Sequence, residues 1–406
     1  MLELELLPGS ALQDRHARQR HTRAIVFLTR SPKATSGTPS GLSSSIFLQR
    51  NMYLSRRNLL LSGVSGFALS ACATNLSSYS STPVSELAAS AGVCYSTYVV
   101  LRAGKPQSPV VVNGCGPSNN LGPDGILQAA SLTKPVIAFV TLELARAGKI
   151  DLRSPVSAYL PNGYLHRQKP FAGPDDNRTD RVAPAVLARI PVATLLNHSS
   201  GFPNWTSSAL TPAFEPGHRW QYSGEGYLIL QALIAAVTGE STETTVSRLV
   251  FEPLGMRDSR MRLTDDIRGR VVSGVGPFGH RTHFEFTEPN AAASMYTTAS
   301  DYAKFLGALA FRRDLLSLTV ADPVPVDREL GLSWGHGWGI ETAEAVPYLW
   351  QWGNNPGYRA FAMLSVNSGD GFVLMTNSEN GLRLAASLAQ STVPAKHGVF
   401  RFHMLG

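Results

Sequence analysis

A serine and a lysine three residues apart are the pair in this sequence best suited to covalent catalysis. Ser131 and Lys134 stand in the run Ser-Leu-Thr-Lys, directly before Pro135. One helical turn brings residues three apart onto the same face, and proline is tolerated in a first turn. A serine hydroxyl becomes a good nucleophile when a base removes its proton, and a lysine held in a dry site can be that base. The spacing alone is weak evidence, because a surface turn with a solvated lysine fits it equally well.

Four short motifs further along the chain give this pair its significance. They are Asn-His-Ser-Ser-Gly at 197–201, Phe-Glu-Pro-Gly at 214–217, Tyr-Ser-Gly-Glu-Gly-Tyr at 222–227 and Pro-Leu-Gly-Met at 253–256. Together with the Ser-x-x-Lys run, and in this order, they closely resemble the beta-lactamase-related serine hydrolases. That group includes class C beta-lactamases, D-alanyl-D-alanine carboxypeptidases and esterases of beta-lactamase fold. The resemblance spans residues 84–390.

The resemblance implies an acyl-enzyme mechanism with Ser131 as the nucleophile and no cofactor. It implies that Lys134 and Tyr222 manage the protons, with the Tyr222 phenol protonating the leaving group. A nearby cation would stabilise the phenolate form of Tyr222. A half-buried tyrosine beside a turn is the alternative reading of this residue. The expected partner is a small-molecule ester, amide or peptide substrate.

A third element of the family is a Lys-Thr-Gly or His-x-Gly strand whose backbone helps to form an oxyanion hole. The best match here is the run Gln351, Trp352 and Gly353. By this resemblance the backbone N–H groups of Ser131 and Asn354 face the tetrahedral oxyanion, and the three matched residues contribute to substrate binding. A turn rich in Gly, Asn and Pro before a core strand is the alternative.

Two positions depart from the family's pattern. Gly224 stands where many relatives carry asparagine, and Gln351 stands where they carry lysine or histidine. The missing amide would otherwise hydrogen-bond a beta-lactam or peptide carbonyl, and the missing cation would otherwise meet a substrate carboxylate. We therefore expect neutral esters or small amides rather than penicillins. A cell-wall beta-lactamase, carboxypeptidase or D-aminopeptidase is the alternative enzyme, and a catalytically idle, anchored cell-wall binding protein is the alternative of another class.

The histidines of the sequence favour structural roles. We expect His198 to be a turn residue that supports the floor of the active site rather than a base. His280 and His283 lie three residues apart, without the acidic and histidine partners that a zinc site needs. We therefore expect no metal.

Residues 52–72 have the parts of a secretory signal in their usual order. A pair of arginines resembles a twin-arginine signal, and an apolar stretch then leads to Leu-Ser-Ala-Cys at 69–72. This ending resembles a lipobox, which implies a lipid on Cys72 that anchors the protein to a membrane. We therefore expect an exported protein of the periplasm or cell envelope. A membrane-spanning helix is the alternative, but residues 59–71 are too short to cross a bilayer of about 30 Å.

Basic charge is concentrated at the N-terminal end of the chain. The formal net charge is +7, and residues 1–72 hold nine Lys or Arg against three acidic residues. The remainder is close to neutral, so we expect no nucleic-acid ligand. Residues 1–51 show no sustained hydrophobic period. We interpret them as the result of a start codon assigned too far upstream, with a genuine disordered arm as the alternative.

The remaining patterns, with the resemblance, predict an α+β domain of three α/β/α layers, of the beta-lactamase and penicillin-binding transpeptidase type. Strands are expected at 93–101, 110–115, 358–366 and 371–376, and helices at 135–147, 192–197, 227–237, 245–251, 299–310 and 381–390. Strands at both ends imply an antiparallel sheet built from both termini, with helices on its faces and a mostly helical inserted subdomain. We expect a flexible tether at 73–83, the domain at 84–390 and a C-terminal tail at 391–406.

Two cysteines, Cys94 and Cys115, fall on the first predicted strand pair. A two-residue loop at Gly104 and Lys105 would place them opposite each other. An oxidising compartment would then join them in a disulfide. Two reduced core thiols are the equal alternative, because two prolines after the turn can shift the register.

Overall fold

A computed structural model describes residues 75–116, 121–171, 178–276, 279–282 and 284–405. The described residues all belong to one compact unit. The predicted signal at 52–72, with Cys72, and the segment 1–51 lie outside the described residues. In the part that is described, no helix has the length and apolar character needed to cross a membrane.

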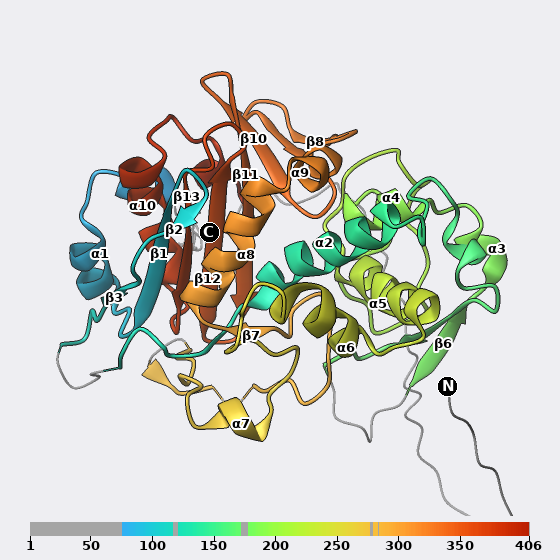
Figure 1. The fold of residues 1–406 in the computed structure, drawn as a ribbon, viewed down its shortest axis with the longest axis horizontal. Helices are drawn as coiled ribbons and strands as arrows, with labels where there is room; N and C mark the ends of the chain where they lie inside the picture. The colour runs from blue at the N-terminus through green and yellow to red at the C-terminus, as the bar shows by residue number, and fades with distance from the viewer. Residues whose placement is uncertain (1–74, 117–120, 172–177, 277–278, 283, 406) are drawn as a thin grey trace, which may run out of the picture. The chain divides into compact units, whose positions relative to one another are not determined.

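A central antiparallel sheet joins the two ends of the domain, as predicted (Figure 1). Strand β1 (Ser96–Arg102) lies beside β13 (Gly371–Thr376), which is followed by β12 (Tyr358–Ser365) and β11 (Val346–Asn355). The sheet continues through β10 (Gly339–Ala343), β9 (Leu332–Trp334) and β8 (Val324–Asp327), and β2 (Lys105–Pro106) and β3 (Val110–Val112) pair with β1. The predictions at 358–366 and 371–376 are confirmed.

Both faces of the sheet are covered, which explains why its central strands are apolar runs rather than alternating ones. On β12, Ala360 and Ala362 belong to one hydrophobic core, whereas Phe361 and Met363 belong to another. Side chains alternate across a strand, so these two cores lie on opposite faces of the sheet. The predicted three-layer arrangement is confirmed.

Different helices supply the two outer layers. The first core contains α2 (Thr133–Arg146) and α8 (Ala299–Phe311), and α8 packs directly on β1 and β13. The second contains α1 (Val84–Ala91), the 3₁₀ helix Gly381–Leu384 and α10 (Ala385–Thr392). Helix α2 is buried on nearly every side, so the amphipathic helix expected at 135–147 is instead the central helix of the domain.

The inserted subdomain lies between these layers in the sequence and is mostly helical, as expected. It contains α3 (Pro184–Leu187), α4 (Val192–Leu196), α5 (Gly224–Thr238), α6 (Thr242–Val246), a π-helical turn at Ser247–Phe251, α7 (Asp265–Arg268) and the hairpin of β5 (Tyr164–Arg167) and β6 (Thr179–Val182). The short strands β4 (Leu127–Gln128) and β7 (Tyr296–Thr297) pair with each other, and α9 (Arg313–Thr319) follows α8.

The predicted domain limits at 84 and 390 are too narrow. Leu76, in the expected tether, is buried in a 3₁₀ helix (Leu76–Tyr79) that packs against α10. In the expected tail, Phe400 and Phe402 are buried in the core shared with β11 and β12. The apolar residues of both segments cover one face of the sheet. They have no regular spacing in the sequence, so the hydrophobic pattern does not predict that they are buried.

The turn of the first hairpin lies one residue earlier than predicted. Arg102 pairs with Lys105, and the two loop residues between them are Ala103 and Gly104. Both have positive φ angles, 49° and 74°, as a type I′ hairpin loop requires. The register derived from a loop at Gly104 and Lys105 is therefore wrong.

Cys94 and Cys115 nevertheless form a disulfide, with their Cα atoms 4.7 Å apart. Both cysteines lie just outside β1 and β3. The strand register therefore does not have to place them directly opposite each other.

Candidate active site

Ser131 lies in a tight turn between β4 and α2. The turn is the 3₁₀ helix Ala130–Leu132, which leads directly into α2 at Thr133. Ala130 has a φ of 48°, a left-handed conformation that is costly for a residue with a side chain and that recurs at functional sites. The side chain of Ser131 stays partly exposed at the head of a buried helix.

The structure brings Ser131 and Lys134 together as their spacing predicts. The ammonium nitrogen Nζ of Lys134 lies 3.0 Å from Ser131 Oγ, and it also donates to the backbone carbonyl of Ala292 at 2.8 Å. Lys134 is only 1% exposed. Its burial lowers the pKa of the lysine to about 7. A substantial share of Lys134 is therefore uncharged at neutral pH and able to accept the serine proton.

Tyr222 completes this group from the residue before the N-cap of α5. Its phenol accepts a hydrogen bond from Nε2 of Gln351 at 3.0 Å, and Nζ of Lys134 lies 4.8 Å from the centre of its ring. Burial raises the pKa of Tyr222 above its usual value, and hydrogen bonds with Ser131 and Gln351 only partly oppose this effect. Burial therefore favours the neutral phenol of Tyr222 over its phenolate form. Of the two groups, Lys134 is the one whose burial favours the form that can accept a proton.

The side chain of Gln351 faces Ser131 and Tyr222. Its side chain is fully buried, and Nε2 donates to the Ser131 carbonyl oxygen as well as to Tyr222, both at 3.0 Å. The predicted role of Gln351 in substrate binding is therefore corrected. The amide links Tyr222 to the turn that carries Ser131. Strand β11 contains no lysine or arginine.

Trp352 also supports the site from within the protein. Its indole is 4% exposed, and its ring centre lies 4.8 Å from that of Tyr222 and 5.7 Å from that of Trp350. The prediction that Trp352 lines the substrate pocket is corrected: it packs behind Tyr222. Gly353 permits a close approach, because a Cβ there would lie 2.5 Å from the Ala129 carbonyl oxygen.

The backbone N–H of Asn354, predicted to be part of an oxyanion hole, points away from β12. The N–H of Val366 donates to the Pro347 carbonyl, so the odd-numbered residues of β11 exchange hydrogen bonds with β12. The N–H of Asn354 therefore points to the opposite side of β11. On that side β10 has already ended, opposite Trp350, and the turn that carries Ser131 packs against β11.

His198 lies beneath Tyr222. It is buried, its ring centre is 4.4 Å from that of Tyr222, and Nδ1 accepts the backbone N–H of Ser223, the N-cap of α5. Burial, and then the positive charge of Lys134, hold the pKa of His198 well below its usual value. It is therefore a neutral residue of the site's floor. His280 is exposed, and His283 lies outside the described residues. Within the described residues, no cluster of His, Cys, Asp or Glu could hold a metal ion.

Sequence reasoning missed the groups that tie the serine turn to its surroundings. Asn355 Nδ2 donates to Oε1 of Gln128 at 2.8 Å and to the Ala293 carbonyl at 3.2 Å. This amide connects β11 with β4 and with the loop that contains Ala292 and Ala293. The carbonyl of Ala292 in the same loop accepts the hydrogen bond from Lys134. A backbone acceptor has no sequence signal, and the adjacent Asn354 and Asn355 read equally well as turn residues.

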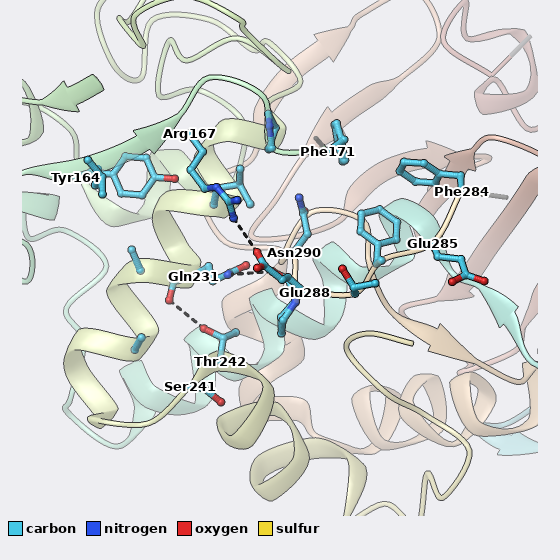
Figure 2. Close-up of a pocket in the computed structure, with 18 residues that line it drawn as sticks. Tyr164, Arg167, Phe171, Gln231, Ser241, Thr242, Phe284, Glu285, Glu288 and Asn290 are labelled. Carbon is cyan, nitrogen blue, oxygen red and sulfur yellow. Dashed lines mark hydrogen bonds and ion pairs between the residues drawn. The ribbon is translucent and has the colours of Figure 1, made fainter. Parts of the chain in front are cut away.

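A separate pocket of about 480 Å³ lies beside α5 (Figure 2). Its lining includes none of the residues Ser131, Lys134 and Tyr222. An ion pair joins Arg167 and Glu288, 2.7 Å apart, and both residues line the pocket. This pocket is therefore not where the candidate nucleophile reacts.

Comparison with known proteins assigns the chain to a family. The sequence model of the family described as Beta-lactamase matches residues 98–394. Esterase EstB of Burkholderia gladioli is 26% identical over 279 residues, which cover 55% of this chain and 67% of the esterase. Penicillin-binding protein 4* of Bacillus subtilis is 22% identical over 321 residues, which cover 68% of this chain and 65% of that protein. The chain thus spans about two thirds of the length of each of these relatives.

Solved structures agree on the fold. The Beta-Lactamase/D-Alanine Carboxypeptidase from Pseudomonas syringae matches with a TM-score of 0.63 at 15% identity, over 78% of this chain and 98% of that chain. The D-stereospecific amidohydrolase from Streptomyces matches with a TM-score of 0.57 at 19% identity, over 75% of this chain and 97% of that chain. At these identities the likeness concerns the fold alone.

Proposed function

Because the chain belongs to the beta-lactamase family of serine hydrolases, we propose that it hydrolyses a neutral ester or small amide through an acyl-enzyme on Ser131. One observation carries the proposal. A buried lysine, Lys134, whose pKa is lowered to about 7, lies 3.0 Å from the hydroxyl oxygen of a serine that remains partly exposed. This is the arrangement of a base beside an activated nucleophile.

Acylation begins when uncharged Lys134 takes the proton of Ser131. The serine oxygen then forms a bond to the substrate's carbonyl carbon, and the carbonyl π electrons move onto its oxygen. The backbone N–H groups of Ser131 and Asn354 donate to this oxyanion, and donors fixed in advance supply much of the stabilisation of such transition states. When the intermediate collapses, the bond to the leaving group breaks. The leaving oxygen or nitrogen takes a proton from the phenol of Tyr222, which recovers one from Lys134.

Deacylation repeats these steps with water as the nucleophile. A water molecule gives a proton to uncharged Lys134 and attacks the acyl carbon. The bond to the oxygen of Ser131 then breaks, this oxygen takes a proton from the phenol of Tyr222, which recovers one from Lys134, and the carboxylic acid leaves. Gln351 takes no proton in either step, because both donor contacts of its amide hold Tyr222 and the serine turn.

The choice of a neutral acyl donor rests on the substituted positions. Position 351 carries no charge, and the Nε2 of its amide donates to two groups within the protein. A charge-assisted contact to a substrate carboxylate is therefore absent at this position. A beta-lactamase or D-amino-acid peptidase is the second candidate, supported by relatives described as penicillin-binding proteins. The idle binding protein is disfavoured, because Ser131, Lys134 and Tyr222 are in contact.

Labelling with a fluorescent fluorophosphonate tests the nucleophile. We expect labelling of the wild-type protein and none of Ser131→Ala, while Ser90→Ala, an exposed serine on α1, keeps it. An unlabelled wild-type protein would support the idle binding protein. A panel of 4-nitrophenyl butyrate, a D-amino-acid amide and nitrocefin tests the acyl donor. Rapid turnover of nitrocefin with little hydrolysis of the butyrate would contradict the preference for neutral esters.

Export and anchoring through Cys72 remain part of the proposal and rest on residues 52–72. The disulfide between Cys94 and Cys115 supports them, since structural disulfides are typical of oxidising compartments such as the periplasm. In a bacterium that processes lipoproteins, we expect the wild-type protein in the membrane fraction and Cys72→Ser in the soluble fraction. Equal distribution of the two proteins would refute the lipid anchor.

A further inference from the structure

The indole of Trp205 takes up the space beside Gly224. A Cβ atom built on Gly224 would lie 2.3, 2.5 and 2.7 Å from three carbons of the Trp205 ring. Real Cβ atoms do not approach other atoms this closely, so a larger residue at 224 requires the ring to move. A side chain at position 224 and the present position of the Trp205 ring are therefore incompatible.

This space lies on the catalytic side of the chain. Ser223, between Tyr222 and Gly224, is extended, with φ −137° and ψ 114°. Residues on either side of an extended residue project to the same side of the backbone. The Trp205 ring thus borders the same side of this segment as the phenol of Tyr222, and the tryptophan is only partly buried.

Trp205 is the first member of an aromatic cluster. Its ring centre lies 4.6 Å from that of Phe171, in an edge-to-face arrangement, and Phe171 lies 6.1 Å from both Phe284 and Phe286. Phe171 is 41% exposed, so part of its ring is open to solvent. The backbone carbonyl of Phe284 accepts a hydrogen bond from Gln128, three residues before the nucleophile.

The three phenylalanines also line the pocket beside α5, in which Phe171 and Phe284 lie near each other (Figure 2). Trp205 is not part of that lining. The indole therefore lies between Gly224, on the side of the catalytic residues, and the cluster that borders the pocket.

Buried polar groups that take no part in the chemistry hold the loop of Trp205. The N–H of Thr206 donates to Glu225, and the N–H of Leu210 donates to Asp180. His166, fully buried, lies between the two acids, 2.6 Å from Asp180 and 3.4 Å from Glu225. Both ends of the short loop after Trp205 are thus fixed to the body of the protein.

The backbone before Trp205 is held as well. The N–H groups of Gly224 and Glu225 both donate to the carbonyl of Asn204, each at 3.1 Å. The first turn of α5 therefore fixes the backbone of Asn204, the residue before the tryptophan. A ring fixed in this way is preorganised and loses little conformational entropy when a ligand packs on it.

From these contacts we infer that Trp205 is a specificity-determining residue, which receives a planar apolar group of the substrate on a wall that it shares with Phe171. The inference rests on the proposed ester hydrolysis. A side chain at position 224 could donate or accept hydrogen bonds, whereas an indole face offers offset or edge-to-face contact with a second ring. The aryl group can belong to the acyl part or to the leaving group, and the test distinguishes the two.

The test compares three esters in a pH-stat assay. Methyl acetate carries no ring, methyl benzoate carries it on the acyl side, and phenyl acetate carries it on the leaving group. For each ester the measured quantity is the kcat/KM of the wild type divided by that of Trp205→Ala, so the intrinsic reactivity of the ester cancels. We expect a ratio near one for methyl acetate and roughly tenfold higher for one of the two aryl esters.

Three variants serve as controls. Trp205→Phe keeps a ring and should retain most of the aryl preference, and Trp205→Leu keeps apolar bulk without one and should lose it. Phe311→Ala removes an aromatic residue that is 62% exposed at the end of α8, and it should leave all three ratios at one. Fluorophosphonate labelling confirms that each variant retains a competent site.

The failures are distinguishable. If the wild type hydrolyses none of the esters, the proposed ester hydrolysis is overturned and this inference with it. If the wild type is active and the three ratios agree within twofold, only the role of Trp205 is overturned.

Discussion

The contact between Trp205 and Gly224 predicts a reversal in the effect of a single methyl group. Gly224→Ala adds a Cβ that would lie 2.3 Å from the indole, so the ring must move by about 1 Å to restore ordinary carbon–carbon contact. Overpacking of this kind costs about 1–3 kcal/mol. The φ angle of Gly224 is not positive, so the backbone itself accepts alanine.

In a protein without the indole, Gly224→Ala should raise the free energy of unfolding instead of lowering it. Gly224 is the first residue of α5, and alanine is favoured over glycine in a helix by up to about 1 kcal/mol. In the Trp205→Ala background, Gly224→Ala therefore has only this favourable effect, and it should raise the free energy of unfolding by about 0.5–1 kcal/mol. The coupling free energy between the two sites should be about 1–3 kcal/mol.

Urea unfolding followed by far-UV circular dichroism measures the four proteins of this double-mutant cycle without relying on tryptophan fluorescence. Gly226→Ala is the matched control, because it lies in the same helix and its nearest contact would be Ser223 Oγ at 3.2 Å. This control should show no coupling to Trp205→Ala. Additivity of Gly224→Ala and Trp205→Ala within about 0.5 kcal/mol would refute the reasoning.

Four further outcomes follow from the site. The kcat/KM for an ester should rise with pH to a plateau, with a midpoint near the Lys134 pKa of about 7, since the base must be uncharged; a flat profile from pH 5 to 9 would count against Lys134. Gln351→Leu should lower kcat by roughly 10- to 100-fold with a smaller change in KM, because it frees Tyr222 without touching substrate, and an effect confined to KM would contradict this. Glu225→Leu leaves the N–H of Thr206 without its acceptor and should cost about 1–3 kcal/mol in urea unfolding, whereas Glu225→Gln retains an acceptor and should cost less. Replacing Cys94 and Cys115 together by serine should lower the free energy of unfolding by about 3 kcal/mol, and dithiothreitol should have no further effect on that variant.

The parts of the site that sequence predicts well are local. Ser131 and Lys134 lie one helical turn apart, so the start of a single helix determines their contact. The strands at 358–365 and 371–376 were also predictable, because a strand buried on both faces is a continuous apolar run.

Of the strands between 324 and 355, only the run 351–353 was expected on a strand, and that by resemblance; the others were missed because they have no local pattern. This region mixes Pro, Asp, Gly and Trp, and its strands β8 to β11 are stabilised by their neighbours rather than by a pattern of their own. Gln351 shows the consequence for function. Its partners are Ser131 and Tyr222, more than a hundred residues away, and nothing in a local motif indicates whether an amide turns inward or towards substrate.

The two departures from the family's pattern take on a different meaning in three dimensions. In the sequence alone, Gly224 and Gln351 stand where relatives carry groups that recognise the substrate, so they indicate that these groups are missing. In the folded protein, Gln351 has become an internal support for Tyr222, and the space beside Gly224 is filled by Trp205. Reverting position 224 alone to asparagine should therefore fail to restore amide recognition, because the indole already occupies the space that its side chain needs. Only the combined change of Trp205→Ala with Gly224→Asn leaves room for a hydrogen-bonding side chain, so substrate preference at this site depends on the pair of residues rather than on either one.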